Sequence, residues 1–148
     1  MQITLRGSGK DEKIELEPVR ALNYPACTSC EGGYDLICKL AIDVGCYHVR
    51  FDRLYSATGA LYRFGTQLQA CYDTLDGVAE YALIYEKDLV FRVFMRRGGH
   101  ATVRGTFRAQ PETCTALTFE METDQSCFPP VIAAIEELKK LYGGMQGV

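Results

Sequence analysis

The spacing with the most chemical meaning is Cys27-Thr-Ser-Cys30, which places two thiols two residues apart. Such a pair can chelate zinc or cycle between a dithiol and a disulfide. A zinc site would need two more ligands, and the chain contains no second C-x-x-C and no H-x-x-x-H. Pro25 and the turn Glu31-Gly32-Gly33 flank the pair, so we expect it in a loop rather than at the helix start of a thioredoxin-type site. A pair of free loop thiols is the leading interpretation, zinc or redox chemistry at Cys27 and Cys30 is the alternative, and no cofactor or metal is predicted.

A second candidate for chemistry is His100, which follows the Gly98-Gly99 turn. It could act as a general base beside Arg104, whose guanidinium would bind an anion, but an exposed histidine after a hairpin turn explains the same residues. Glu120 and Glu122 share one side of a predicted strand, which suits acid–base work in a cleft or, more simply, a solvated face. The chain lacks the G-x-G-x-x-G, G-x-x-x-x-G-K-[ST], G-x-S-x-G and H-E-x-x-H motifs. We therefore predict that the protein is not an enzyme, with a small enzyme using His100 as the alternative.

Charge is distributed unevenly along the chain. Residues 87–108 carry six bases and one acid, whereas residues 109–137 carry six acids and no base, within a net charge of −3. Arg104 and Arg108 are expected to pair across strands with the nearby glutamates. The alternative is a polarised face that meets a complementary partner. The acidic balance argues against a strongly basic nucleic-acid binder.

The seven cysteines are an odd number, so they cannot all pair within one chain. The first six residues have a strand-like pattern rather than that of a signal peptide, and no apolar run approaches the roughly 20 residues of a membrane span. These features predict a cytoplasmic protein with free thiols and no membrane partner. The length of 148 residues predicts one domain, with a less regular part at 1–33, a regular part at 34–142 and a frayed tail at 143–148.

Two hydrophobic periods divide the chain into strands and helices. Alternating apolar and polar residues predict strands at 2–6, 12–17, 35–43, 47–52, 79–85, 89–96, 100–108 and 117–122. Apolar spacings of three and four residues predict amphipathic helices at 58–77 and 126–142. Gly65 lies inside the first helix at a cost of about 1 kcal/mol relative to alanine, so we expect close packing there.

Each predicted strand has one apolar face, and each predicted helix has one apolar stripe. The simplest packing is a single antiparallel sheet of about six to eight strands, with a meander in the C-terminal half because the joints there are short. Both helices would cover one face of this sheet, and the other face would stay polar and solvated. The predicted fold class is therefore α+β.

Several short motifs occur in a characteristic order. They are Leu75-Asp76-Gly77-Val78-Ala79 for the pattern L-x-G-x-A, Gly99, His100, Val103 and Gly105 for G-H-x-x-V-x-G, and Phe119 followed by Asp124-Gln125-Ser126 before the last helix. In this order the chain resembles the WapI-type family of small bacterial immunity proteins. The resemblance spans residues 34–142 and leaves the cysteine-rich segment before Gly32 outside.

Members of that family neutralise the toxin domains of contact-dependent or wall-associated effectors. The resemblance therefore implies a non-catalytic protein whose partner is a cognate toxin domain, bound through about 800 Å² of surface on each side. A small oligomeric scaffold is the remaining alternative, with a second copy of the chain as its partner. The predicted contact residues lie on the polar sheet face and in the loop at 24–34. They are His48, Arg50, Arg92, Arg96, His100, Arg104, Glu120, Glu122, Tyr24 and Tyr34.

Overall fold

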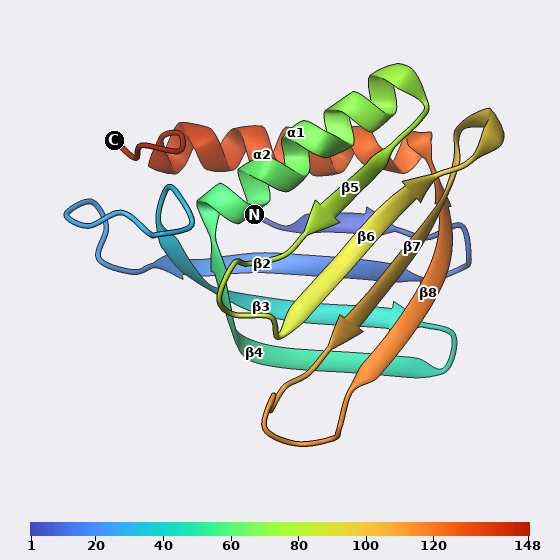
Figure 1. Ribbon diagram of the computed structural model, residues 1–148, viewed down its shortest axis with the longest axis horizontal. Helices are drawn as coiled ribbons and strands as arrows, with labels where there is room; N and C mark the ends of the chain where they lie inside the picture. The colour runs from blue at the N-terminus through green and yellow to red at the C-terminus, as the bar shows by residue number, and fades with distance from the viewer.

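Eight strands form where apolar and polar residues alternate, and they assemble into two four-stranded antiparallel sheets (Figure 1). The computed structural model describes all 148 residues. Sheet A consists, in spatial order, of β1 (Ile3–Arg6), β2 (Lys13–Ala21), β3 (Asp35–Val44) and β4 (Tyr47–Ala57). Sheet B consists of β5 (Val78–Tyr81), β6 (Leu89–Met95), β7 (His100–Phe107) and β8 (Leu117–Asp124). Each strand pairs with its neighbour in sequence, so both sheets are meanders, as predicted for the C-terminal half.

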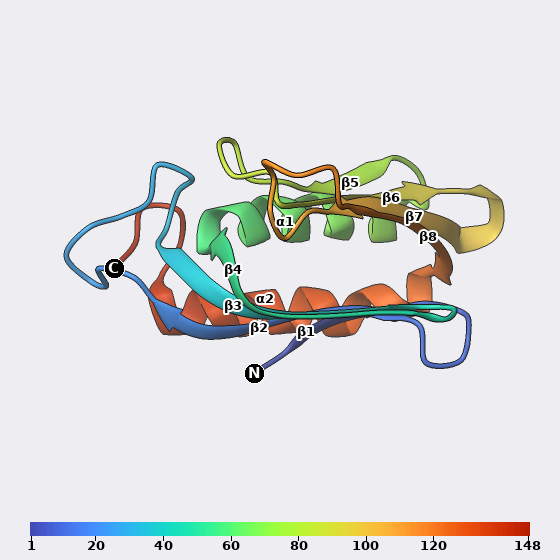
Figure 2. The ribbon, with the colours of Figure 1, turned by 90° about the horizontal axis from the view of Figure 1, so that it is seen from below.

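The α+β class is confirmed, but the prediction of a single sheet is wrong because β4 and β5 do not pair. Helix α1 (Thr58–Thr74) follows β4 and carries the chain from sheet A to sheet B. The sheets lie face to face as two layers, and the strands of sheet B cross those of sheet A obliquely (Figures 1 and 2). An alternating pattern identifies the apolar face of a strand but not the element that covers it, so a second sheet satisfies the pattern as well as a helix does.

The two helices close one long side of the sandwich instead of covering one face of a sheet (Figure 1). Helix α1 packs beside β5, the first strand of sheet B, and α2 (Phe128–Tyr142) packs beside β1, the first strand of sheet A. The helices also contact each other, and a Cβ atom at Gly65 would lie 3.1 Å from Cδ1 of Ile135 on α2. The close packing predicted at Gly65 is thereby confirmed. Neither helix has the length and apolar character needed to cross a bilayer.

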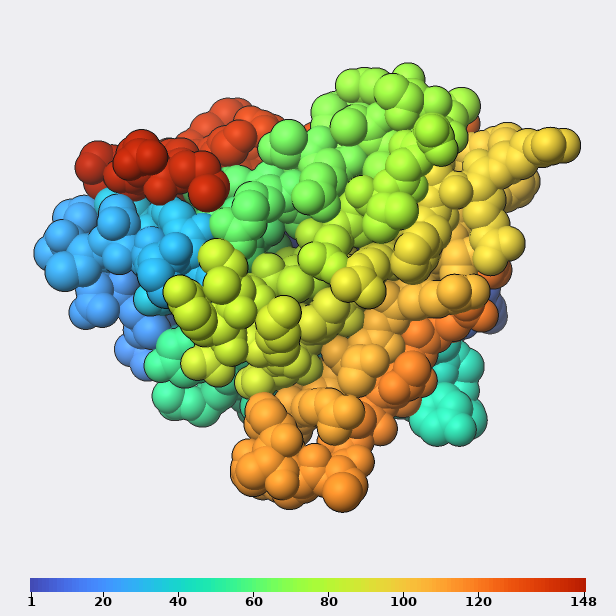
Figure 3. Space-filling view, in the orientation of Figure 1, coloured from blue at the N-terminus to red at the C-terminus, as the bar shows by residue number.

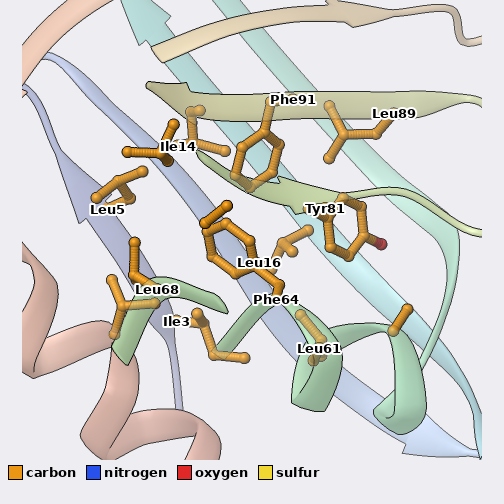
Figure 4. Packing of buried hydrophobic residues seen from close by; sticks show 14 of the residues in the cluster. Ile3, Leu5, Ile14, Leu16, Leu61, Phe64, Leu68, Tyr81, Leu89 and Phe91 are labelled. Atoms are coloured by element: carbon orange, nitrogen blue, oxygen red, sulfur yellow. The ribbon is translucent and has the colours of Figure 1, made fainter. Parts of the chain in front are cut away.

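One continuous apolar core lies between the sheets and under the helices. A cluster of 31 buried residues draws on all eight strands and both helices. Leu5, Ile14 and Leu16 of sheet A point toward Phe91 of sheet B, with Phe64 of α1 beside them (Figure 4). The inward residues of both sheets are buried in this core. The outward residues of each sheet therefore form two separate solvent-facing surfaces.

The sheets are also joined by hydrogen bonds at one corner. The Ser8 N–H, in the turn after β1, donates to the Glu122 carbonyl of β8 at 2.7 Å. The Thr123 hydroxyl donates to the Arg6 carbonyl, also at 2.7 Å. These contacts occupy backbone groups at the end of the β8 edge and fix the position of sheet B relative to sheet A.

Candidate functional site

Four charged side chains form a row across the outer face of sheet B. Glu80 of β5 lies opposite Arg92 of β6, and Glu120 of β8 lies opposite Arg104 of β7. The two arginines lie opposite each other in the middle. Directly opposite residues on neighbouring strands have Cβ atoms about 5 Å apart. We call this acid–base–base–acid arrangement the charged row.

Each arginine of the charged row is held by the glutamate outside it. The Arg92 Nε donates to Glu80 Oε2 at 2.5 Å, and the Arg104 Nε donates to Glu120 Oε1 at 2.6 Å. The Arg104–Glu120 pair confirms part of the predicted cross-strand pairing. No hydrogen bond within the chain uses the terminal nitrogens of either arginine. Both pairs are exposed, so each contributes under about 1 kcal/mol to folding, and their donors remain free for a partner.

A hollow of about 440 Å³ adjoins the two arginines. Its lining consists of Val90, Arg92, Arg104, Gly105, Thr106, Thr118, Phe119 and Glu120. It lies at the end of sheet B that carries the loops at 82–88 and 108–116, on the face turned toward the viewer in Figure 3. The guanidinium carbon of Arg104 also lies 5.8 Å from the centroid of the Phe94 ring, which favours a fixed position for this cation.

Glycine is required at residue 105, beside the hollow. A Cβ atom there would lie 2.6 Å from Phe119 Cζ and 2.8 Å from the Val90 carbonyl oxygen. The inward side of β7 at this point is therefore filled by neighbouring atoms. The glycine of the G-H-x-x-V-x-G pattern thus has a packing role in sheet B.

The remaining predicted residues of sheet B are exposed and more loosely connected. Glu122 accepts a hydrogen bond from the buried Thr102 hydroxyl at 3.1 Å. Arg96 and His100 flank the turn between β6 and β7, where the Arg96 N–H donates to the His100 carbonyl. The His100 side chain is exposed to solvent.

His48 and Arg50 belong to β4 of sheet A, whereas the charged row belongs to sheet B, and the two sheets form opposite layers of the molecule (Figure 2). The prediction of one polar face that contains all the charged candidates is therefore wrong, because the charges divide between two sheets. Both side chains bind Asp43, a 7% exposed residue of β3 that the sequence analysis did not select. Arg50 donates through both terminal nitrogens, at 2.8 and 3.0 Å, and His48 Nδ1 lies 2.8 Å from the same carboxylate. These bonds, with that of Arg50 the strongest, hold the pKa of Asp43 below its usual value.

The aromatic residues of the 24–34 loop have a structural role in the molecule. Tyr34 is 1% exposed, its hydroxyl donates to the Pro25 carbonyl, and it also accepts a hydrogen bond from the Val148 N–H. Tyr24 is exposed on one side and packs edge-on against Tyr34 and Tyr142. Burial removes Tyr34 from the predicted contact surface. The C-terminal tail is bound to this loop, which overturns the prediction that it is frayed.

Glu31 is a buried charge that sequence reasoning assigned only to a turn. Its carboxylate accepts hydrogen bonds from Arg63 of α1 at 2.9 Å and from the Ile84 N–H at 2.8 Å. Its carbonyl also accepts from Arg63, at 2.6 Å. Glu31 thereby joins the loop before β3, helix α1 and the loop after β5. Its partners are 32 and 53 residues away in sequence, so no local pattern could have identified it.

The groups proposed for metal or redox chemistry are dispersed. Cys27 and Cys30 are exposed free thiols, and no three His, Cys, Asp or Glu side chains are close enough together to hold a metal ion. The turn between β6 and β7, which ends at His100, lies at the other end of the molecule from the loop between β2 and β3 that carries these cysteines (Figure 1). Cys38 is buried in the core, which raises the pKa of its thiol to about 12.

These features describe a small two-sheet α+β protein whose charged row is exposed on the outer face of sheet B. A family model described as the immunity protein WapI-like family matches residues 4–143, and the chain belongs to this family. The match includes the N-terminal hairpin and the cysteine-containing loop, so the prediction that the resemblance begins at residue 34 is too narrow. No curated protein and no solved structure matches the chain.

Proposed function

We propose that this protein is a non-catalytic immunity protein that binds a cognate bacterial toxin domain and neutralises it. Membership of the immunity protein family over residues 4–143 is the observation that carries this proposal. The geometry supports it, because donors without partners lie on an open sheet face and the candidate nucleophile and base residues are far apart. Such a face suits contact with a protein surface, whereas catalysis needs a nucleophile and a base within hydrogen-bond reach.

In this proposal the protein acts by occupying the surface of the toxin that its substrate would use. A standard interface of about 800 Å² on each partner is large enough to cover an active site. We infer that the protein acts in the cytoplasm of the producing cell; seven free cysteines support this, because a reducing compartment keeps thiols unpaired.

A direct test uses, as the candidate toxin domain, the C-terminal domain of any large secreted protein that a neighbouring gene encodes. Purified toxin domain is mixed with increasing amounts of this protein, and the toxic activity and the mass of the complex are both measured. The proposal predicts a one-to-one complex and loss of activity at equimolar ratio. Full activity in the presence of excess protein, or turnover of the toxin by catalytic amounts, would contradict it.

A further inference from the structure

The two sheets differ in how their arginines are arranged. On sheet A, Arg50 donates to Asp43 through both terminal nitrogens. On sheet B, Arg92 and Arg104 use only Nε within the chain. Arg20 and Arg53 of sheet A also have free donors, so sheet B is distinguished by the arrangement: two partly free guanidinium groups lie directly opposite each other on neighbouring strands.

Arg92 and Arg104 lie opposite each other, and the repulsion between their positive charges is unfavourable unless an anion offsets it. Like charges directly opposite on neighbouring strands repel each other. Glu80 and Glu120 offset part of the repulsion, but they bind from the outer sides and leave the space between the guanidinium groups without an anion. A carboxylate placed there would accept charge-assisted hydrogen bonds from both arginines, the strongest class of such bonds.

We propose that the charged row and the adjoining hollow form the toxin-contacting surface, and that they seat an acidic side chain of the toxin between Arg92 and Arg104. This inference rests on the proposed function. The acid–base–base–acid order also predicts the charges beside that carboxylate on the toxin. Glu80 and Glu120 favour a basic group of the toxin on each side of it. The complementary partner surface is thus base–acid–base, and such matching gives specificity as well as affinity.

The same order argues against a nucleic acid as the occupant. Proteins bind a phosphate backbone through several successive Lys or Arg side chains, and the affinity for the nucleic acid rises with each added cation. Here the two cations are bounded on both sides by carboxylates, within a chain of net charge −3. A single carboxylate fits between the arginines, whereas a polyanion would meet the flanking glutamates.

The hollow completes the surface with apolar and hydroxyl groups. Val90, Thr106 and Thr118 line it next to the arginines. Arginine and well-packed apolar contacts are typical of the few residues that supply most of the binding energy of an interface. We therefore place the centre of the interface here, rather than on the 24–34 loop, where Tyr34 is already buried.

The test is calorimetric binding of a catalytically inactive toxin domain to wild type and to the double variant R92Q/R104Q. The proposal predicts that the variant binds the toxin domain at least about 30-fold more weakly. A loss of this size is typical when one partner of a buried charge pair at an interface is removed. The matched control is K139Q/K140Q, which removes two cations from exposed ion pairs on α2 and should bind like wild type. Circular dichroism melting of each variant verifies that the fold is kept.

The second arm uses the variant E80Q/E120Q with the toxin domain and with a short labelled RNA. The proposal predicts weaker toxin binding and no measurable RNA binding by the wild type. RNA binding that E80Q/E120Q strengthens and R92Q/R104Q abolishes would overturn it in favour of a nucleic acid. Equal toxin binding by R92Q/R104Q and wild type would overturn this inference alone, whereas absence of wild-type binding would refute the proposed function as well.

Discussion

Replacing Glu31 with glutamine tests whether the buried carboxylate holds three segments of the fold together. Glu31 is 5% exposed, and its carboxylate binds Arg63 and the Ile84 N–H at 2.9 and 2.8 Å. Breaking a buried ion pair costs about 3–5 kcal/mol, and losing a charge-assisted bond to a backbone N–H costs about 1.5–3 kcal/mol. Arg63 is 37% exposed, so water recovers part of the loss. We expect Glu31→Gln to lower the free energy of unfolding by about 3 kcal/mol, a large fraction of the 5–15 kcal/mol typical of a domain.

The assay is equilibrium unfolding in guanidinium chloride followed by far-ultraviolet circular dichroism. The midpoint should fall while the slope of free energy against denaturant stays constant, because the buried area is unchanged. Glu137→Gln is the matched control, since the Glu137–Lys140 pair is exposed, and it should leave the midpoint unchanged. A midpoint for Glu31→Gln equal to that of the control would refute the assignment of Glu31 as a structural tie.

Three further predictions concern the packing at Gly105, the ionised carboxylate of Asp43 and the reactivity of the cysteines. Gly105→Ala should destabilise the protein by about 3 kcal/mol in the same unfolding assay, because the added methyl group overlaps Phe119 and a backbone carbonyl; a neutral effect would contradict the packing at this point. The pKa of Asp43 is lowered by Arg50, so its stabilising effect is complete above the unfolded pKa of about 3.9 and is lost as the pH falls through the folded pKa. As the pH is lowered from 7 to below the pKa of Asp43, the melting temperature should therefore fall less for Asp43→Asn than for wild type. Equal decreases in the two proteins would contradict a stabilising role of the Asp43 carboxylate. A thiol reagent should modify the four exposed cysteines of the native protein quickly, whereas the buried Cys38, with a pKa near 12, should react only on unfolding.

The spacing of apolar residues predicted the strands and helices, and the short joints predicted the strand order of the C-terminal half. The short joints after residue 78 required a hairpin order in sheet B, and the register that follows from it brought Arg104 next to Glu120 as expected. The helices were evident from their period, and Gly65 indicated a close contact that Ile135 makes. These features depend on residues near in sequence or on one strand register.

The remaining features depend on contacts between distant segments. An apolar strand face does not specify whether a sheet or a helix covers it, so the division into two sheets was not predictable from alternation. That division separated His48 and Arg50 from the charged row. The tail binds the 24–34 loop through the Val148 N–H, which donates to the Tyr34 hydroxyl 114 residues earlier in the chain.

The central claim is tested most directly by protection of living cells. Cells that express the cognate toxin domain should stop growing, and co-expression of this protein should restore growth. The account predicts rescue by wild type and by K139Q/K140Q, and loss of rescue by R92Q/R104Q at equal protein level. Growth arrest that wild-type protein does not relieve would contradict the claim that this protein neutralises that toxin.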